Sequence, residues 1–123
     1  MPVMWATESP TIEAGGIVAR PMAVPSRGST ELAVWQSTVA PGYAGVAHTL
    51  DREEVFVVQA GQLRLTIDGR PLDLAPGDAL AVQPGEVVSV GNPAAAPATV
   101  LICSSAGVLA TVGGQTIAPP WAQ

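Results

Sequence analysis

Lysine is absent from this chain of 123 residues, and cysteine and histidine occur once each, as Cys103 and His48. The lack of lysine excludes Schiff-base catalysis, because that chemistry needs a side-chain amine. A single cysteine excludes an internal disulfide and a cysteine-rich zinc site. A single histidine excludes every metal motif that uses two imidazoles. His48 is therefore the only imidazole available for catalysis or metal binding.

Positive charge is also scarce, because five arginines stand against ten acidic residues, giving a formal net charge of −5. Such a chain is repelled by the phosphates of nucleic acids and by anionic membranes, so we expect neither as a partner. No apolar run approaches the roughly 20 residues that cross a bilayer. The first residues lack the basic and apolar regions of a secretory signal peptide. Together with a free cysteine, these features predict a cytoplasmic protein.

Glycine and proline are plentiful, at 13 and 12 residues, and they separate short apolar runs. Hydrophobic residues make up 48% of the chain, which is enough for the core of one domain. No stretch shows helical periodicity, whereas short runs rich in β-branched residues recur from residue 31 onward. Short strands with Gly/Pro turns between them predict an all-β barrel or a double-sheet jelly roll.

The predicted strands follow one another along a single domain. They cover residues 31–39, 45–49, 54–59, 62–67, 70–74, 79–82, 87–90, 99–104, 108–112 and 115–117. Before them lies an N-terminal arm over 1–29, with a candidate edge strand at residues 17–19; the barrel spans 30–112 and a C-terminal tail spans 113–123. Trp121 in the tail is expected either to cap the barrel or to pack on a neighbouring subunit.

Two motifs give this pattern a specific resemblance. The first runs Gly42, five residues, His48, one residue, Leu50, three residues, Glu54, six residues, Gly61. These spacings resemble the first motif of the cupin superfamily, in which a second histidine stands at the position of Leu50. The resemblance therefore covers every spacing of the motif and departs from it at one ligand position.

The second motif begins at Gly77 and ends at Asn92. It is similar to the second cupin motif, with Gln83 in place of its proline and Val88 in place of its histidine. A segment of 15 residues, 62–76, separates the two motifs. The resemblance extends over about residues 31–105, and it implies a double-stranded β-helix, the jelly-roll barrel of cupins.

The resemblance also raises the question of a metal. Metal-binding cupins hold Fe, Mn, Zn or Ni with two histidines and a glutamate from the first motif and a histidine from the second. Only His48 and Glu54 remain here, since Leu50 and Val88 donate no lone pair. A stable divalent site usually has three or four protein ligands, so we expect no metal and no other cofactor. The alternative is an incomplete metal site held by His48 and Glu54.

The resemblance implies that His48 and Glu54 project into the barrel and converge. We expect the carboxylate to hydrogen-bond to the imidazole directly or through one water, which favours the imidazolium and fixes its tautomer. In an apolar cup, the pair would act as general acid and base in metal-independent isomerase, lyase or cyclase chemistry. One alternative is a non-catalytic cupin that binds or senses a small molecule. Another is a structural His48 that Glu54 merely satisfies.

The expected pocket lining follows from alternation along the strands. Side chains that share the parity of Glu54 or Val88 point inward, whereas on the first strand alternation leaves open whether Trp35 or Gln36 does. The expected lining comprises Trp35, Leu50, Phe56, Val58, Val88 and Val90. Such a lining predicts a mostly apolar pocket for a small organic ligand.

Two further expectations concern Cys103 and assembly. Cys103 lies in an apolar strand with no cationic neighbour in sequence, so we expect a small buried hydrophobe and no nucleophile. Cupins frequently form dimers, and edge strands without lysine offer little protection against pairing. The sequence therefore predicts a homodimer, with the arm and the tail at its interface.

Overall fold

The computed structural model describes all 123 residues and consists of β-strands and short 3-10 helices. The helices are η1 (Ala6–Glu8), η2 (Pro25–Arg27) and η3 (Pro120–Ala122). The strands are β1 (Ile12–Ala14), β2 (Ile17–Ala23), β3 (Leu32–Val39), β4 (Thr49–Leu50), β5 (Glu54–Ala60), β6 (Leu63–Ile67), β7 (Arg70–Leu74), β8 (Ala79–Val82), β9 (Val88–Gly91), β10 (Ala98–Ser105), β11 (Ala110–Val112) and β12 (Gln115–Ile117). The all-β prediction is confirmed. None of the helices has the length and apolar character needed to cross a membrane.

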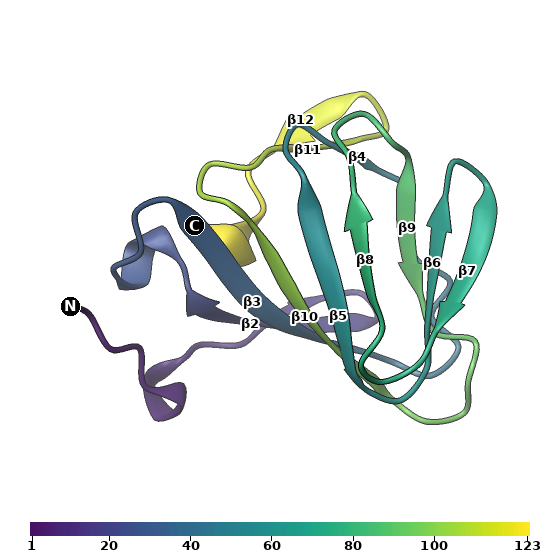
Figure 1. Ribbon diagram of the computed structural model, residues 1–123, viewed down its shortest axis with the longest axis horizontal. Helices are drawn as coiled ribbons and strands as arrows, with labels where there is room; N and C mark the ends of the chain where they lie inside the picture. Colours follow the sequence, from purple (N-terminus) through teal and green to yellow (C-terminus); the bar gives the residue numbers. More distant parts are fainter.

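The strands form a jelly-roll barrel from antiparallel sheets, as expected (Figure 1). One sheet has six strands in the order β1-β2-β3-β10-β5-β8, and two three-stranded sheets have the orders β12-β11-β4 and β7-β6-β9. His48, directly before β4, joins the two smaller sheets through backbone hydrogen bonds of 2.9 and 2.8 Å with Val88 in β9. In Figure 1 both chain termini lie at one end of the barrel, and β6 and β7 lie at the other.

The N-terminal segment is more regular than the sequence predicts. β1 and β2 form a hairpin around Gly15 and Gly16, and β2 pairs with β3 in the six-stranded sheet. Gly15 has a φ of 61°, and a Cβ on Gly16 would overlap the ring of Tyr43. The strand at residues 17–19 is therefore an inner strand, and β1 is the edge. β1 escaped prediction because three residues are too few to show a pattern.

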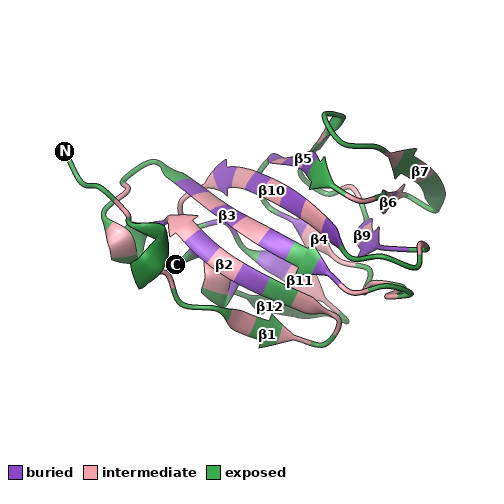
Figure 2. Ribbon diagram, turned by 90° about the horizontal axis from the view of Figure 1, so that it is seen from below, coloured by how far each residue is buried: buried purple, intermediate pink, exposed green.

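The strands of the large sheet alternate between a buried and a more exposed face (Figure 2). On β3, Trp35 and Ser37 are buried, whereas Gln36 is half-buried and Thr38 is exposed. The structure thus resolves the choice that alternation left open, because it turns the Trp35 face of β3 toward the interior.

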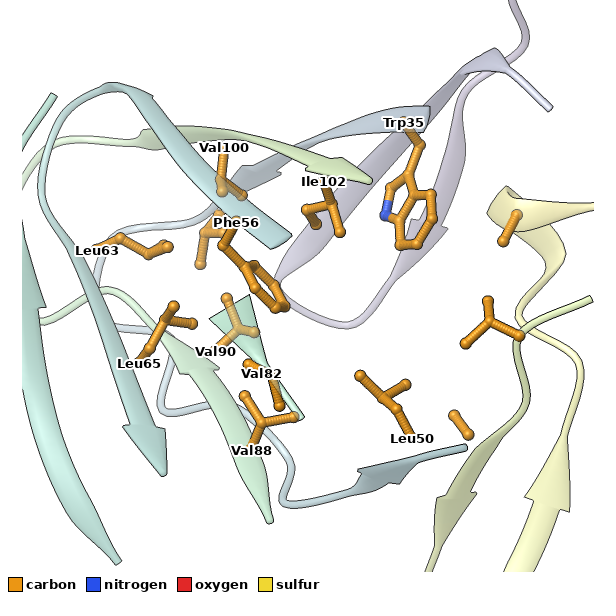
Figure 3. Packing of buried hydrophobic residues seen from close by; sticks show 14 of the residues in the cluster. Trp35, Leu50, Phe56, Leu63, Leu65, Val82, Val88, Val90, Val100 and Ile102 are labelled. Carbon is orange, nitrogen blue, oxygen red and sulfur yellow. The ribbon is translucent and has the colours of Figure 1, made fainter. Parts of the chain in front are cut away.

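The barrel interior is tightly packed at one end and hollow at the other. Leu63, Leu65, Val82 and Val88 fill the end next to β6 and are almost fully buried (Figure 3). Burying one such side chain contributes about 1.5–3 kcal/mol to the stability of the fold. Toward the other end, Figure 3 shows Trp35 projecting into the space between the sheets.

The C-terminal tail folds onto the barrel of its own chain. β12 pairs with β11, and the following helix η3 places Ala122 in the hydrophobic core, where none of its surface is exposed. The backbone amide of Ser26 donates a hydrogen bond of 2.9 Å to the carbonyl oxygen of Gln123. The arm also contributes to this core through Val24, which is 1% exposed. Both terminal segments therefore belong to the barrel.

One predicted strand is largely absent. Residues 45–49 contribute only Thr49 to β4, together with the isolated pairing of His48. Gly45 has a φ of 85°, and a Cβ there would collide with the backbone of Val90. Because the chain makes this close approach in a left-handed conformation, it cannot continue as an extended strand, and it reaches His48 as a loop.

Candidate functional site

A cavity of about 410 Å³ lies in the hollow part of the barrel, within the usual size range of small-molecule sites. All three sheets, the β1–β2 hairpin and the C-terminal tail contribute to its wall. The lining residues are Ala14, Gly15, Ile17, Trp35, Ser37, Tyr43, Val46, His48, Leu50, Glu54, Phe56, Val90, Ile102, Ala110, Val112, Ile117, Pro119 and Trp121. Most of these side chains are apolar, so the cavity resembles a hydrophobic pocket with a few polar groups.

The structure brings most of the expected site residues to this cavity. Those that line it are His48, Glu54, Trp35, Leu50, Phe56 and Val90. Val58 and Val88 lie instead in the packed core, with exposures of 1% and 0%. Alternation predicts the face on which a side chain lies but not its depth along the barrel, and Val58 lies one step beyond Phe56 toward the packed end.

Several lining residues come from segments that sequence reasoning left out of the pocket. Tyr43 and Val46 lie in the loop before His48, and Ile17 lies at the start of β2. Trp121 comes from the C-terminal tail. The only sequence feature that indicates a role at the end of the barrel is its large aromatic side chain between a proline and an alanine. Its position at the cavity corresponds to the expectation that Trp121 caps the barrel.

Glu54 is the only acidic residue at the cavity wall. It begins β5 and lies opposite Ser104 in β10 and Val82 in β8, which places its side chain inside the barrel. The residue is 4% exposed, and its carboxyl group makes no hydrogen bond or ion pair within the protein. Burial among apolar side chains raises the pKa of Glu54 from 4.5 to about 8. The carboxyl group is therefore mostly protonated at pH 7.

The neighbouring Glu53 has a different environment. Its side chain is exposed and accepts a hydrogen bond of 2.7 Å from Nε2 of Gln83. Ser104, which lies opposite Glu54 in the sheet, donates its hydroxyl proton to the backbone carbonyl of Glu53 at 2.8 Å. Because the Ser104 hydroxyl pairs with the backbone of Glu53, it makes no hydrogen bond with the Glu54 carboxyl group.

His48 also lines the cavity, from a position between β4 and β9. Its Nδ1 lies 2.9 Å from the carbonyl oxygen of Val46. A carbonyl oxygen only accepts, so Nδ1 must carry a proton and donate it, which leaves Nε2 available to a ligand. Of the two expected arrangements, direct or through one water, the direct hydrogen bond between His48 and Glu54 does not form, and Nδ1 of His48 pairs with the backbone of Val46 instead.

Ser37 provides a further polar group at the wall. It lies on β3 beside Trp35, is 4% exposed, and its hydroxyl makes no hydrogen bond within the protein. The polar groups at the cavity thus comprise a carboxylic acid, an imidazole nitrogen and a hydroxyl that lack partners in the chain. Since no fully buried side-chain polar atom in the protein lacks a partner, these three groups are open to the cavity and free to bind a ligand.

The side chains at the cavity do not fit the metal site that the cupin resemblance implies. His48 and Glu54 are the only lining residues among histidine, cysteine, aspartate and glutamate. No group of three or more such residues could hold a metal ion anywhere in the structure. Leu50 presents an apolar side chain to the cavity, and Val88 is buried in the core. Two donors fall short of the three or four that a stable site uses.

Comparisons with known proteins identify the fold family. The family model described as "Cupin domain" matches residues 35–104, which is more than half of the chain. No curated protein sequence matches the chain. The family match runs from within β3 to within β10, and it therefore includes ten of the 18 residues that line the cavity.

Solved structures show the same fold at low sequence identity. The polyketide cyclase RemF from Streptomyces resistomycificus superposes with a TM-score of 0.76 and 17% identity, covering 98% of this chain and 82% of that one. A sugar phosphate isomerase from Silicibacter pomeroyi gives 0.75 and 20%, covering 93% and 83%. An RmlC-like cupin from Shewanella frigidimarina gives 0.73 and 18%, covering 84% and 88%. At such identities the likeness concerns the fold alone.

Proposed function

The chain belongs to the cupin family, and we propose that its barrel cavity binds a small organic molecule on which Glu54 and His48 act as acid and base. The observation that carries the proposal is the buried Glu54 carboxyl group, which has no partner in the protein and opens onto a cavity of about 410 Å³. No fully buried side-chain oxygen in the protein lacks a hydrogen-bond partner, so the unpaired Glu54 carboxyl group is open to the cavity. A bound ligand that accepts a hydrogen bond can therefore reach Glu54 directly.

The two residues have complementary roles in this proposal. Glu54 retains its proton at pH 7 because burial raises its pKa to about 8, so it donates a proton or a hydrogen bond. His48 in its neutral form carries its proton on Nδ1, held by Val46, and offers the lone pair of Nε2. A general acid and a general base on facing walls of one cavity suit reactions that move a proton within a substrate.

The proposed chemistry is metal-independent isomerisation, elimination or cyclisation. In the first step, Nε2 of His48 removes a proton from the carbon next to a carbonyl group, while Glu54 gives its proton to the carbonyl oxygen, producing an enol. In the second step, for a substrate with a carbon–carbon double bond next to the enol, His48 delivers its proton to the far carbon of that double bond. The enol returns its oxygen-bound proton to Glu54, and the double bond moves next to the re-formed carbonyl group. Both residues end in their starting protonation states. One neighbour of similar fold is described as an isomerase and another as a cyclase.

The alternative is a cupin that binds or senses a small molecule without converting it. It uses the same cavity and the same unpartnered groups, and it differs only in whether a proton moves. Hydrogen–deuterium exchange separates the two, because an enol formed in D₂O takes up deuterium at the carbon that lost its proton.

The test uses 2-acetonaphthone, an uncharged aromatic ketone, incubated with the protein in buffered D₂O and followed by proton NMR. We expect the protein to accelerate loss of the methyl signal over buffer alone. His48→Ala and Glu54→Gln should each reduce this acceleration at least tenfold, within the usual contribution of one acid or base.

The matched controls are Arg52→Ala and Glu53→Gln, which change exposed residues beside the site without touching the cavity. Both should exchange at the wild-type rate. If the ketone binds but wild-type protein and His48→Ala exchange it no faster than buffer, the acid–base proposal fails and the binding alternative stands.

We further propose that two copies of the chain associate through the outer face of the six-stranded sheet. Val34, Cys103, Val55 and Ala81 lie in one row across β3, β10, β5 and β8, on the side opposite the cavity. The outward side chains of these four strands carry no charge, although the chain has a net charge of −5. A second copy is the occupant that this face suits, because two uncharged faces meet without repulsion and remove the apolar row from water.

A further inference from the structure

We propose that the cavity selects uncharged ligands and rejects anions, so that its ligand is a mostly apolar molecule with a carbonyl or hydroxyl oxygen. This inference rests on the proposed function, since it names the class of molecule that the same cavity takes. It follows from where the positive charges of the chain lie and from which polar groups face the cavity.

No lysine or arginine side chain reaches the cavity. The chain has no lysine, and none of its five arginines contributes to the wall. Arg64 forms an ion pair of 2.7 Å with Asp73 across β6 and β7. Arg27 donates to the backbone carbonyls of Pro21 and Met22 at 3.0 and 2.9 Å. These arginines are thus already engaged outside the site.

The other three arginines are placed on the outside of the molecule. Arg20 donates a hydrogen bond of 3.0 Å to the Gln36 side chain on the outer face of the large sheet. Arg52 and Arg70 are exposed, the first in the turn before β5 and the second at the start of β7. An anion inside the barrel would therefore meet none of the five arginine side chains.

This arrangement penalises an anionic ligand. Moving a carboxylate from water into an apolar site without a cation costs several kcal/mol, because nothing replaces its hydration. The acidic group at the wall, Glu54, supplies no compensating positive charge. An uncharged ligand of the same shape escapes this penalty and gains from contact with the aromatic rings of Trp35, Phe56 and Trp121.

The polar groups that are present suit a neutral oxygen. The Ser37 hydroxyl both donates and accepts, the protonated Glu54 donates, and Nε2 of His48 accepts when the ring carries only its Nδ1 proton. A carbonyl or hydroxyl oxygen satisfies this set with one or two hydrogen bonds. The rest of such a ligand lies against apolar side chains, which is the usual division of labour in small-molecule sites.

The experiment compares two competitors of nearly identical shape, 2-acetonaphthone and 2-naphthoate, of which only the second is charged at pH 7. The reporter is N-phenyl-1-naphthylamine, an uncharged dye that brightens in apolar sites. We expect the ketone to displace the dye from wild-type protein at a concentration about 100-fold lower than the carboxylate does, as a charge penalty of a few kcal/mol requires.

A variant tests the cause of this difference. Val46 lines the cavity at its mouth and is 56% exposed, so Val46→Arg adds a cation at the wall with little effect on packing. We expect Val46→Arg to strengthen carboxylate binding at least tenfold relative to ketone binding. Val46→Leu is the matched control and should retain the wild-type preference.

The outcomes separate this inference from the function on which it rests. If both competitors displace the dye at similar concentrations, the cavity binds small molecules but the charge selection is wrong. The same conclusion follows if Val46→Arg leaves the carboxylate as weak as before. If the dye and both competitors fail to bind at all, the proposed function fails, and the inference fails with it.

Discussion

His48 donates its Nδ1 proton to the carbonyl oxygen of Val46, at 2.9 Å, and forms no hydrogen bond with Glu54. The backbone of the preceding loop therefore fixes the tautomer of the imidazole, and the carboxyl group does not. Glu54 in turn is left without a charged partner, so burial dominates and its pKa rises to about 8. Because the two side chains do not pair with each other, Glu54 keeps its proton and can act as an acid, and Nε2 of His48 stays free to act as a base.

The stability of the protein should fall as pH rises through the neutral range. In the unfolded chain Glu54 loses its proton above about pH 4.5, whereas in the folded protein it keeps the proton up to about pH 8. The folded state binds more protons in between, so the free energy of unfolding decreases by about 1.4 kcal/mol per pH unit across this window. Urea denaturation at pH 5, 6, 7 and 8 measures the slope.

The variant Glu54→Gln should remove this slope, because glutamine does not titrate. Glu53→Gln changes the adjacent exposed carboxyl group and should keep the slope of the wild type. An equal slope in wild type and Glu54→Gln would show that other groups cause the pH dependence and that Glu54 is not buried as a neutral acid.

Trp121 should contribute to both the cavity and the fold. Its ring lines the cavity and packs against the hydrophobic core, and its half-buried position suggests a loss of about 2 kcal/mol for Trp121→Ala. We also expect dye affinity to fall about tenfold, since one wall is removed. Trp5→Ala, at a residue that is 61% exposed, should change neither quantity measurably. Unchanged dye affinity in Trp121→Ala would contradict the position of the tail at the cavity.

The missing metal ligands should be restorable. The variant Leu50→His adds a third metal-ligating side chain to His48 and Glu54, and all three positions line the cavity. We expect it to retain about one Zn²⁺ per chain after dialysis, as a site with three protein ligands does, whereas the wild type retains no stoichiometric metal. Elemental analysis gives the content, and circular dichroism confirms that the variant is folded. Stoichiometric metal in the wild type that disappears in His48→Ala would overturn this assignment.

Self-association should be detectable by light scattering. The chain mass is 12.4 kDa, so a dimer has twice that mass. Val55→Glu places a charge in the centre of the outer apolar row and should give the monomer mass at micromolar concentration. Arg70→Glu alters an exposed residue far from this row and should leave the mass unchanged. A wild type that is monomeric under the same conditions would exclude this interface.

Much of the fold was predictable because its signals are local. Asp68 and Gly69 have φ values of 49° and 81°, as the Asp-Gly hairpin signal requires. The strands from β5 to β10 begin and end within about a residue of the predicted limits. The spacing of the first motif also placed His48 and Glu54 on one cavity.

The remaining features depend on contacts that local patterns do not encode. The hairpin of β1 and β2 forms because Gly16 makes room for Tyr43, which lies far along the chain. The depth of Val58 and Val88 along the barrel depends on which other side chains fill the packed end. The orientation of the His48 ring depends on a single backbone carbonyl in a loop. None of these three features produces a periodic pattern or a fixed spacing of residues in the sequence.

The protonation state of Glu54 is the most direct test of the account. Carbon-13 NMR of the side-chain carboxyl group, assigned by its loss in Glu54→Gln, follows that state as pH is varied. The account predicts a titration midpoint near the pKa of about 8 that burial gives Glu54. A midpoint near 4.5, the ordinary pKa of an exposed glutamate, would contradict both the neutral acid and the function built on it.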